Sequence, residues 1–253
     1  MRKVSNLAMA CLGAIAMLTF SGATFAESVK VNVANGKNIF ENGKPDDGVA
    51  ACSSCHGETA MGMDAMGTPR LSHLGYVYVV KQLTDFADDK RNPEGLGAVM
   101  NGFAKALTAQ ERRDVSAYVN TIARTSEPSD LAALKDEGQT VGEAYKGKII
   151  VQYGKSNVSA CVSCHGYNGR GSDPIYPKIG EQKYVYLVNQ LTNWRDGSRA
   201  NDEMGQMRAI AKHLSDDDIN NAAAYLSQAP ESTPGNGMVV DNQSVLKKII
   251  GHK

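Results

Sequence analysis

Several features are scarce in this 253-residue chain, and each absence narrows what it can be. Lys and Arg together number 27, as do Asp and Glu, so no excess of positive charge is available to bind nucleic acid. The main apolar run, residues 7–20, has 14 residues and is too short to span a bilayer. Alternating runs that would indicate β-strands are nearly absent. The composition therefore predicts an all-α globular protein.

The apolar run lies in an N-terminal segment with the features of a secretory signal. Arg2 and Lys3 give a short basic start, and small residues follow the apolar run up to Ala26. We expect cleavage near Ala26 and export to a bacterial periplasm. A cut after Ala23 and a retained membrane anchor are the alternatives.

Removal of the signal leaves a chain without a spare cysteine. With 25 basic and 27 acidic residues, that chain has a net charge of −2. Its four cysteines all fall in two Cys-x-x-Cys-His motifs, formed by Cys52, Cys55 and His56 and by Cys161, Cys164 and His165. An exported cysteine would otherwise be expected to form a disulfide.

The two motifs belong to a long internal repeat. Residues 51–57 match 160–166, residues 69–86 match 177–194, and residues 100–119 match 207–226. The offset changes only from 109 to 107, which indicates a duplicated domain rather than a solenoid. We expect a signal at 1–26, domains at 27–130 and 131–230 around a polar linker (124–140), and a C-terminal tail at 231–253.

Each copy has helical patterning. Val79, Leu83 and Phe86 are spaced as on one helix face, and capping boxes, Thr108 with Glu111 and Ser215 with Asp218, precede the last helix of each copy. Shorter helices are expected at 36–40 and 147–151. An apolar stripe, Val115, Tyr118, Val119 and Ile122, follows the first capping box.

Three chemistries can use a Cys-x-x-Cys-His motif. A zinc site would have to combine half-sites that 105 residues separate, and a redox dithiol needs a βαβ surrounding and no histidine. Covalent haem attachment uses every residue of the motif, since the thiols bind the porphyrin and the histidine coordinates the iron. The sequence therefore predicts two haem c groups, attached through Cys52, Cys55, Cys161 and Cys164, with His56 and His165 as axial ligands.

The sixth ligand of each iron decides between ligand chemistry and electron transfer. Met100 follows His56 by 44 residues, and Met207 follows His165 by 42. Met204 competes in the second copy but aligns with Gly97, so the repeat selects Met100 and Met207. Core packing of these methionines is the alternative. Three further histidines, His73, His213 and His252, do not recur between the copies.

The motifs and repeats together resemble two class I cytochrome c domains in tandem, as in dihaem cytochromes of the c4 type. The resemblance rests on CSSCHG and CVSCHG, on residues 69–86 and 177–202, and on 204–226. It implies that the Pro69 and Pro177 carbonyls accept hydrogen bonds from the axial imidazoles. It also implies that Gly36 and Gly147 lie where helices cross. Arg91 and Arg199 could reach haem propionates, or could equally be solvated.

The resemblance further implies a non-enzymatic electron carrier of the respiratory chain. Its expected partners are redox proteins, such as a bc-type complex and a haem-copper terminal oxidase, and it allows peripheral association with the membrane. Two alternatives stay open. One is a cytochrome subunit of a dehydrogenase, and the other is a dihaem peroxidase with one iron open to substrate.

Overall fold

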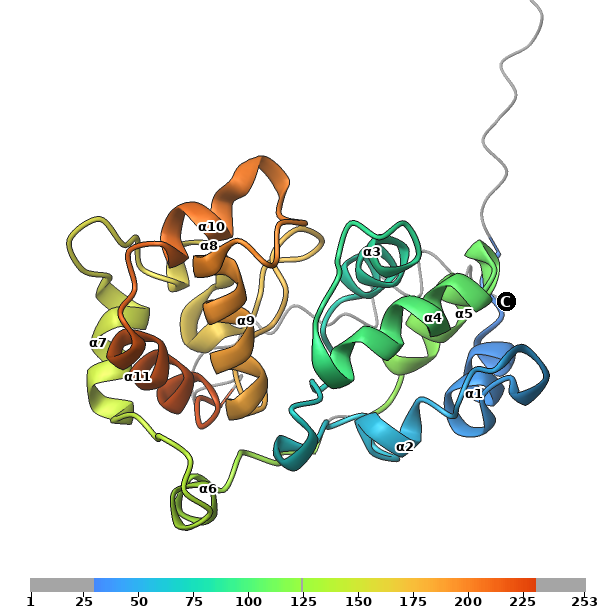
Figure 1. Ribbon diagram of the computed structural model, residues 1–253, viewed down its shortest axis with the longest axis horizontal. Coiled ribbons are helices and arrows are strands. Elements are labelled where there is room, and N and C mark those ends of the chain that lie inside the picture. The colour runs from blue at the N-terminus through green and yellow to red at the C-terminus, as the bar shows by residue number, and fades with distance from the viewer. Residues whose placement is uncertain (1–29, 124, 231–253) are drawn as a thin grey trace, which may run out of the picture.

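The computed structural model describes residues 30–123 and 125–230, and these contain helices and isolated β-bridges but no extended strand (Figure 1). The expected signal (1–26) and tail (231–253) lie outside the described residues. Within the described ranges, no helix is long and apolar enough to cross a membrane. The all-α prediction is confirmed.

The described chain forms two helical halves that lie side by side (Figure 1). The N-terminal half contains α1 (Val33–Asn42), α2 (Ser53–His56), α3 (Tyr76–Ala87), α4 (Val99–Ala106) and α5 (Ala109–Val119), with 3-10 turns η1 (Pro45–Asp47), η2 (Asp64–Met66) and η3 (Gly95–Ala98). The C-terminal half repeats this order as α7 (Ala144–Tyr153), α8 (Val162–His165), α9 (Tyr184–Asp196), α10 (Gln206–Ala211) and α11 (Asp216–Leu226), with η4 (Tyr167–Gly169) and η5 (Glu203–Gly205).

The first and last helices of each half cross at a glycine. A Cβ atom on Gly36 would lie 2.1 Å from the Asp114 carbonyl oxygen, and one on Gly147 would lie 1.8 Å from that of Asn221. Real Cβ contacts are never this short, so only glycine lets α1 meet α5 and α7 meet α11 at this distance. The expected crossing positions are therefore where the helices make their closest approach.

Both predicted capping boxes are present. The Thr108 hydroxyl accepts from the Glu111 amide at 3.2 Å, and the Glu111 carboxylate accepts from the Thr108 amide at 2.8 Å. Ser215 and Asp218 do the same in the C-terminal half. The helix ends earlier than the apolar stripe suggests, because α5 stops at Val119 and Ile122 packs against the core from beyond it.

A helix occupies part of the expected linker. The Asp130 carboxylate caps α6 (Leu131–Asp136) by accepting from the Ala132 and Ala133 amides at 3.1 and 3.0 Å. Leu134 of this helix is buried in the C-terminal core. The C-terminal half thus begins with a packed helix, whereas the residues described before α1, from Lys30 onward, contain no helix.

Candidate haem sites and the interface between them

Each Cys-x-x-Cys-His motif forms one short helical turn. Cys52 is the N-cap of α2, and the Thr68 hydroxyl donates to the Cys55 carbonyl at 2.6 Å. The Gly62 amide donates to the His56 carbonyl at 2.8 Å, and Gly171 does the same for His165 at 2.6 Å. These bonds fix the turn after the histidine, so that both thiols and the imidazole are held on one rigid element.

The two histidines are buried and oriented by prolyl carbonyls. The His56 Nδ1 lies 2.9 Å from the Pro69 carbonyl oxygen, and the His165 Nδ1 lies 2.8 Å from that of Pro177. A carbonyl can only accept, so Nδ1 carries the proton and Nε2 keeps its lone pair. Burial lowers the pKa of both imidazoles, which favours the neutral form that binds iron.

The four motif cysteines are free thiols in the described chain. Burial raises the pKa of Cys52 and of Cys161 to about 11, so both stay protonated near neutrality. A redox dithiol needs a thiolate with a lowered pKa, which these first cysteines do not provide. No three His, Cys, Asp or Glu side chains gather as a metal site within the described ranges. The donor set fits two thioether attachments and one axial imidazole per half.

The methionines fall into distinct environments. Met100 and Met207 are each the second residue of a helix, α4 and α10, and both are half-buried. Met204 is 91% exposed. Met61 is buried, and its sulfur accepts a hydrogen bond from the Ser72 hydroxyl at 3.2 Å. Met100 and Met207 thus occupy equivalent places in the two halves, whereas Met204 points into solvent.

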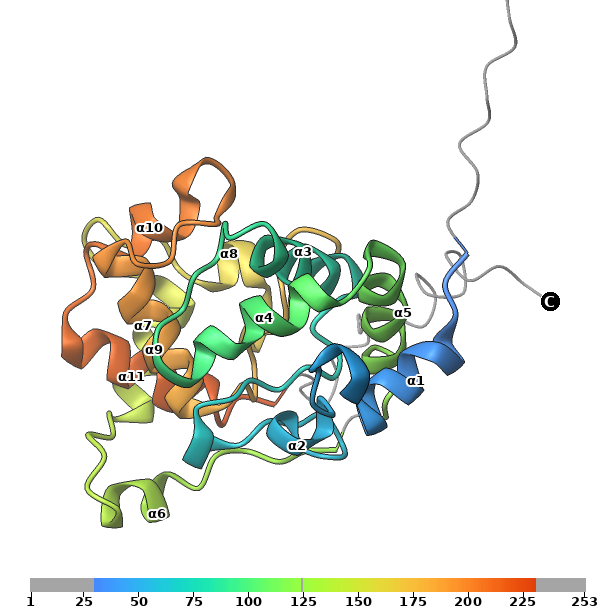
Figure 2. The same cartoon turned by 45° about the vertical axis from the view of Figure 1, so that its right-hand side comes forward.

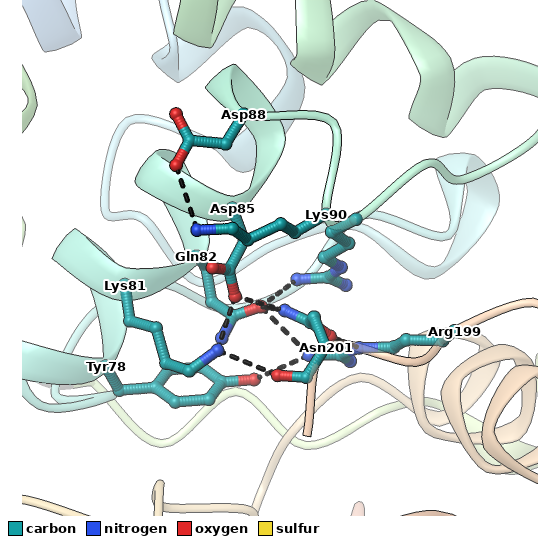
Figure 3. A network of polar contacts seen from close by, with 9 residues as sticks. Tyr78, Lys81, Gln82, Asp85, Asp88, Lys90, Arg199 and Asn201 are labelled. Atoms are coloured by element: carbon teal, nitrogen blue, oxygen red, sulfur yellow. Dashed lines mark hydrogen bonds and ion pairs between the residues drawn. The ribbon is translucent and has the colours of Figure 1, made fainter. Parts of the chain in front are cut away.

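Arg91 and Arg199 are buried between the halves rather than solvated, at 7% and 5% exposure. Arg91 donates to Gln190 at 2.8 Å and to the Tyr186 hydroxyl at 3.1 Å. Arg199 donates to Gln82 at 3.0 Å and to the Tyr78 hydroxyl at 3.2 Å, as Figure 3 shows in part. Each arginine is therefore held by α3 or α9 of the opposite half.

The charge of this cluster fits a cofactor that carries carboxylates. Within the described chain, both guanidinium groups donate to Gln, Tyr and Asn oxygens and not to a carboxylate. Burial and the neighbouring Arg199 charge lower the pKa of Arg91. A buried pair of like charges needs nearby negative charge. The propionates of two haems would supply such charge, so Arg91 and Arg199 fit a cofactor of this kind.

The interface is symmetric at its centre and asymmetric at its edge. Tyr78, Gln82 and Arg91 are each 108 residues before their counterparts Tyr186, Gln190 and Arg199. At the edge, Lys81 forms an ion pair with Asp85 and donates to the Asn201 carbonyl at 2.8 Å (Figure 3). Asp85 corresponds to Asn193, so only the N-terminal half places a carboxylate here.

Two further contacts join the halves, and the sequence analysis missed both. An Asp64 oxygen accepts from the Val185 amide at 3.1 Å, so the N-terminal half caps α9. The fully buried Arg70 forms two hydrogen bonds with the side-chain amide of Gln182. The Arg70 backbone amide donates to the Gln182 oxygen at 2.7 Å, and the Gln182 nitrogen donates to the Arg70 carbonyl at 3.0 Å. No local periodicity signals a contact over more than 100 residues. The one available signal was that Asp64 recurs as Asp173 at the repeat offset of 109.

Comparison with known proteins also indicates two cytochrome c domains. The sequence model of the cytochrome c family matches residues 33–123 and 151–230. A thiosulfate dehydrogenase electron acceptor from Stutzerimonas stutzeri strain A1501 is 34% identical, over 82% of this chain and 92% of its own length. Cytochrome c4 from Stutzerimonas stutzeri is 36% identical, over 70% of this chain and 84% of its own length.

Two solved structures share the fold. Reduced cytochrome c4 from Pseudomonas stutzeri aligns with a TM-score of 0.64 at 29% identity, covering 79% of this chain and all of that one. The thiosulfate dehydrogenase TsdBA from Marichromatium purpuratum aligns with a TM-score of 0.71 at 29% identity, covering 81% of this chain but 42% of the larger protein. The chain belongs to the cytochrome c family, as a dihaem electron carrier with one covalently attached haem c in each half.

Proposed function

We propose that Met100 and Met207 complete the coordination of the two irons, opposite His56 and His165. The observation that carries this proposal is their equivalent, half-buried placement on α4 and α10, set against the solvent-exposed Met204. A haem iron with His and Met ligands takes up and gives up one electron at a raised potential. The protein's part is to hold both ligands in place and to keep Nδ1 protonated at the prolyl carbonyl.

The ligand proposal is tested by the red charge-transfer band of ferric haem bound to methionine. Met100→Ala and Met207→Ala should each remove about half of the band in the oxidised protein, since each leaves one haem intact. The matched control is Met204→Ala, which should leave the band unchanged. If Met204→Ala removes half of the band instead, Met204 is the ligand and the repeat argument is wrong.

We further propose that the physiological donor is a thiosulfate dehydrogenase. The support is that two relatives, 34% and 32% identical, are described as electron acceptors of thiosulfate dehydrogenase. An electron acceptor of this kind must dock to its donor, take up one electron per haem and leave. We propose the periplasm as the place of this exchange and a haem-copper terminal oxidase as the acceptor, as the resemblance to dihaem cytochromes of the c4 type implies.

The donor proposal is tested by stopped-flow mixing of the oxidised protein with purified thiosulfate dehydrogenase and thiosulfate. Both haems should be reduced at a rate proportional to the enzyme concentration, and omission of either enzyme or thiosulfate should abolish reduction. Reduction at an equal rate by the enzyme of an unrelated pathway would show that thiosulfate dehydrogenase is not a specific donor. Tight co-purification with a catalytic subunit would favour the dehydrogenase-subunit alternative.

A further inference from the structure

A single peptide group lies between the His56 imidazole and the C-terminal half. Its carbonyl, that of Pro69, accepts a hydrogen bond from the His56 Nδ1 at 2.9 Å. Its N–H, that of Arg70, donates to the Gln182 side-chain oxygen at 2.7 Å. The carbonyl and the N–H of a trans peptide point in opposite directions, so one peptide makes both bonds without competition. Gln182 belongs to the other half, and the two halves lie side by side in both views (Figures 1 and 2).

The orientation of the Gln182 amide is determined by its partners. Its oxygen accepts from two backbone N–H groups, those of Arg70 and Lys183, at 2.7 and 2.9 Å. Its nitrogen donates to the Arg70 carbonyl at 3.0 Å. A flipped amide would set its N–H groups against those of the backbone, so only this orientation satisfies all three bonds. The Gln182 oxygen is therefore fixed on the Arg70 amide.

This bridge is packed on both sides. Gln182 is 2% exposed, and Arg70 is fully buried. The loop at Gly62 packs against the same peptide, since a Cβ atom there would lie 2.5 Å from both the Arg70 nitrogen and the Pro69 carbonyl carbon. The Gln182 oxygen, and not water, is thus the acceptor for this N–H. Linked hydrogen bonds in such surroundings polarise each other, which strengthens each by about 10–30%.

The repeat gives the C-terminal half no equivalent of Gln182. Gln182 corresponds to Leu74 at the offset of 108 that also relates Pro69 to Pro177. The Leu74 side chain has no acceptor atom, and it is buried in the core of its own half. His56 and His165 therefore have matching carbonyl partners but different groups beyond them.

We propose that Gln182 of the C-terminal half lowers the redox potential of the N-terminal haem through the Pro69–Arg70 peptide. The inference rests on the proposed ligation of that iron by His56. Because Gln182 accepts from the Arg70 N–H, it polarises the peptide and makes the Pro69 carbonyl a stronger acceptor for Nδ1. A stronger bond at Nδ1 makes Nε2 a more basic ligand, which stabilises the ferric state over the ferrous state. Gln182 acts through the peptide and is a positioning residue.

Gln182→Met tests the proposal, because methionine has a similar length and no amide. Reduction adds one electron to the iron, and the Nδ1 proton stays in place, so the potential reports the bond at Nδ1 directly. In a spectroelectrochemical titration of the haem-loaded protein, the equilibrium constant for reduction of one haem should rise about threefold. This is a shift of about 28 mV, at about 59 mV for each factor of ten. The other haem should keep its parent potential.

NMR of the reduced protein identifies the haem that changes. The ring current of a bound haem shifts the Nδ1 proton of its axial histidine, and sequential assignment along α2 and α8 distinguishes His56 from His165. In Gln182→Met the His56 Nδ1 proton should move upfield, as its hydrogen bond weakens, and that of His165 should not move. Gln182→Glu at about pH 8 offers the Arg70 N–H a charged acceptor, and should move the His56 signal downfield.

Ser129→Ala is the control for a general loosening of this region. The Ser129 hydroxyl accepts from the Tyr184 amide at 2.9 Å, two residues after Gln182, and this bond is also buried. Its loss should lower the thermal midpoint, because a buried N–H loses its partner. Both potentials and both Nδ1 signals should keep their parent values.

The possible contrary results separate this inference from the ligation on which it rests. Unchanged potentials and signals in Gln182→Met would overturn the inference, as would a His56 signal in Gln182→Glu that stays in place or moves upfield. Equal shifts of both haems, or the same shift in Ser129→Ala, would assign the effect to loosening of the interface. These results leave the ligation by His56 intact. A parent His56 Nδ1 proton without a ring-current shift would overturn that ligation, and the inference with it.

Discussion

The Arg91 guanidinium of the N-terminal half donates a 2.8 Å hydrogen bond to the side-chain oxygen of Gln190 in the C-terminal half. The same oxygen accepts from Arg199 at 2.6 Å, so one neutral amide group holds two buried like charges. Gln82 has the mirrored role, with bonds of 2.8 Å from Arg91 and 3.0 Å from Arg199. The two halves are thus joined by polar groups whose full set of hydrogen bonds forms only when both halves are present.

Removal of the Gln190 oxygen should destabilise the protein strongly. Gln190→Leu leaves one donor of each buried arginine without its partner, and we expect a loss of about 3 kcal/mol in the free energy of unfolding. Urea denaturation of the haem-loaded protein measures it. Gln190→Glu is the control, since a carboxylate can accept both bonds and should preserve stability. If Gln190→Leu unfolds at the parent's urea concentration, the cluster does not hold the halves together.

Glycine at the helix crossing gives a second prediction. Gly147→Ala forces a Cβ atom into the Asn221 carbonyl and should cost about 3 kcal/mol or prevent folding. Gly102→Ala lies in α4 with no atom near its Cβ position, and should stabilise the protein by about 0.5–1 kcal/mol. Thermal unfolding of the two variants distinguishes close packing from a general effect of alanine. If both substitutions changed the free energy of unfolding in the same direction, the crossing geometry would be contradicted.

The features that the sequence predicted are local in the chain or repeated in it. The Cys-x-x-Cys-His turns, the capping boxes at Thr108 and Ser215, and the helical patterning depend on residues at most four positions from the next one in the pattern. The contact of each histidine with a prolyl carbonyl spans 12 or 13 residues, and it was expected from the resemblance alone. The turns, the caps and the helical patterning are determined by residues close together in the chain, so they can be predicted from one sequence.

The features that the sequence analysis missed depend on the packing of the two halves. Arg91 and Gln190 are 99 residues apart, and nothing near either residue indicates the other. The sequence analysis could not decide whether Arg91 is solvated, because the burial of a charged side chain depends on which surfaces of the folded protein pack around it. Helix α6 was missed because it has only six residues, and its formation depends on the Asp130 cap and on the burial of Leu134 in the core.

The capping box of α11 predicts how stability depends on pH. Burial tends to raise the pKa of Asp218, but the bonds from Lys155 and from Ser215 outweigh it and lower the pKa below its usual value. A carboxyl with a lowered pKa in the folded state stabilises that state above the unfolded pKa of about 4, and this contribution disappears as the pH falls through the folded value.

Asp218→Asn should therefore cost about 1 kcal/mol at pH 7, because it removes the charge that accepts from Ser215 and Lys155. Urea denaturation at several pH values measures the difference between parent and variant. That difference should stay constant from about pH 7 to pH 5 and shrink below about pH 4. Asp217→Asn, the exposed neighbour in the same helical turn, should show a smaller effect. A difference that grows as the pH falls would mean that the folded state raises the pKa of Asp218, and the assignment of the cap would be wrong.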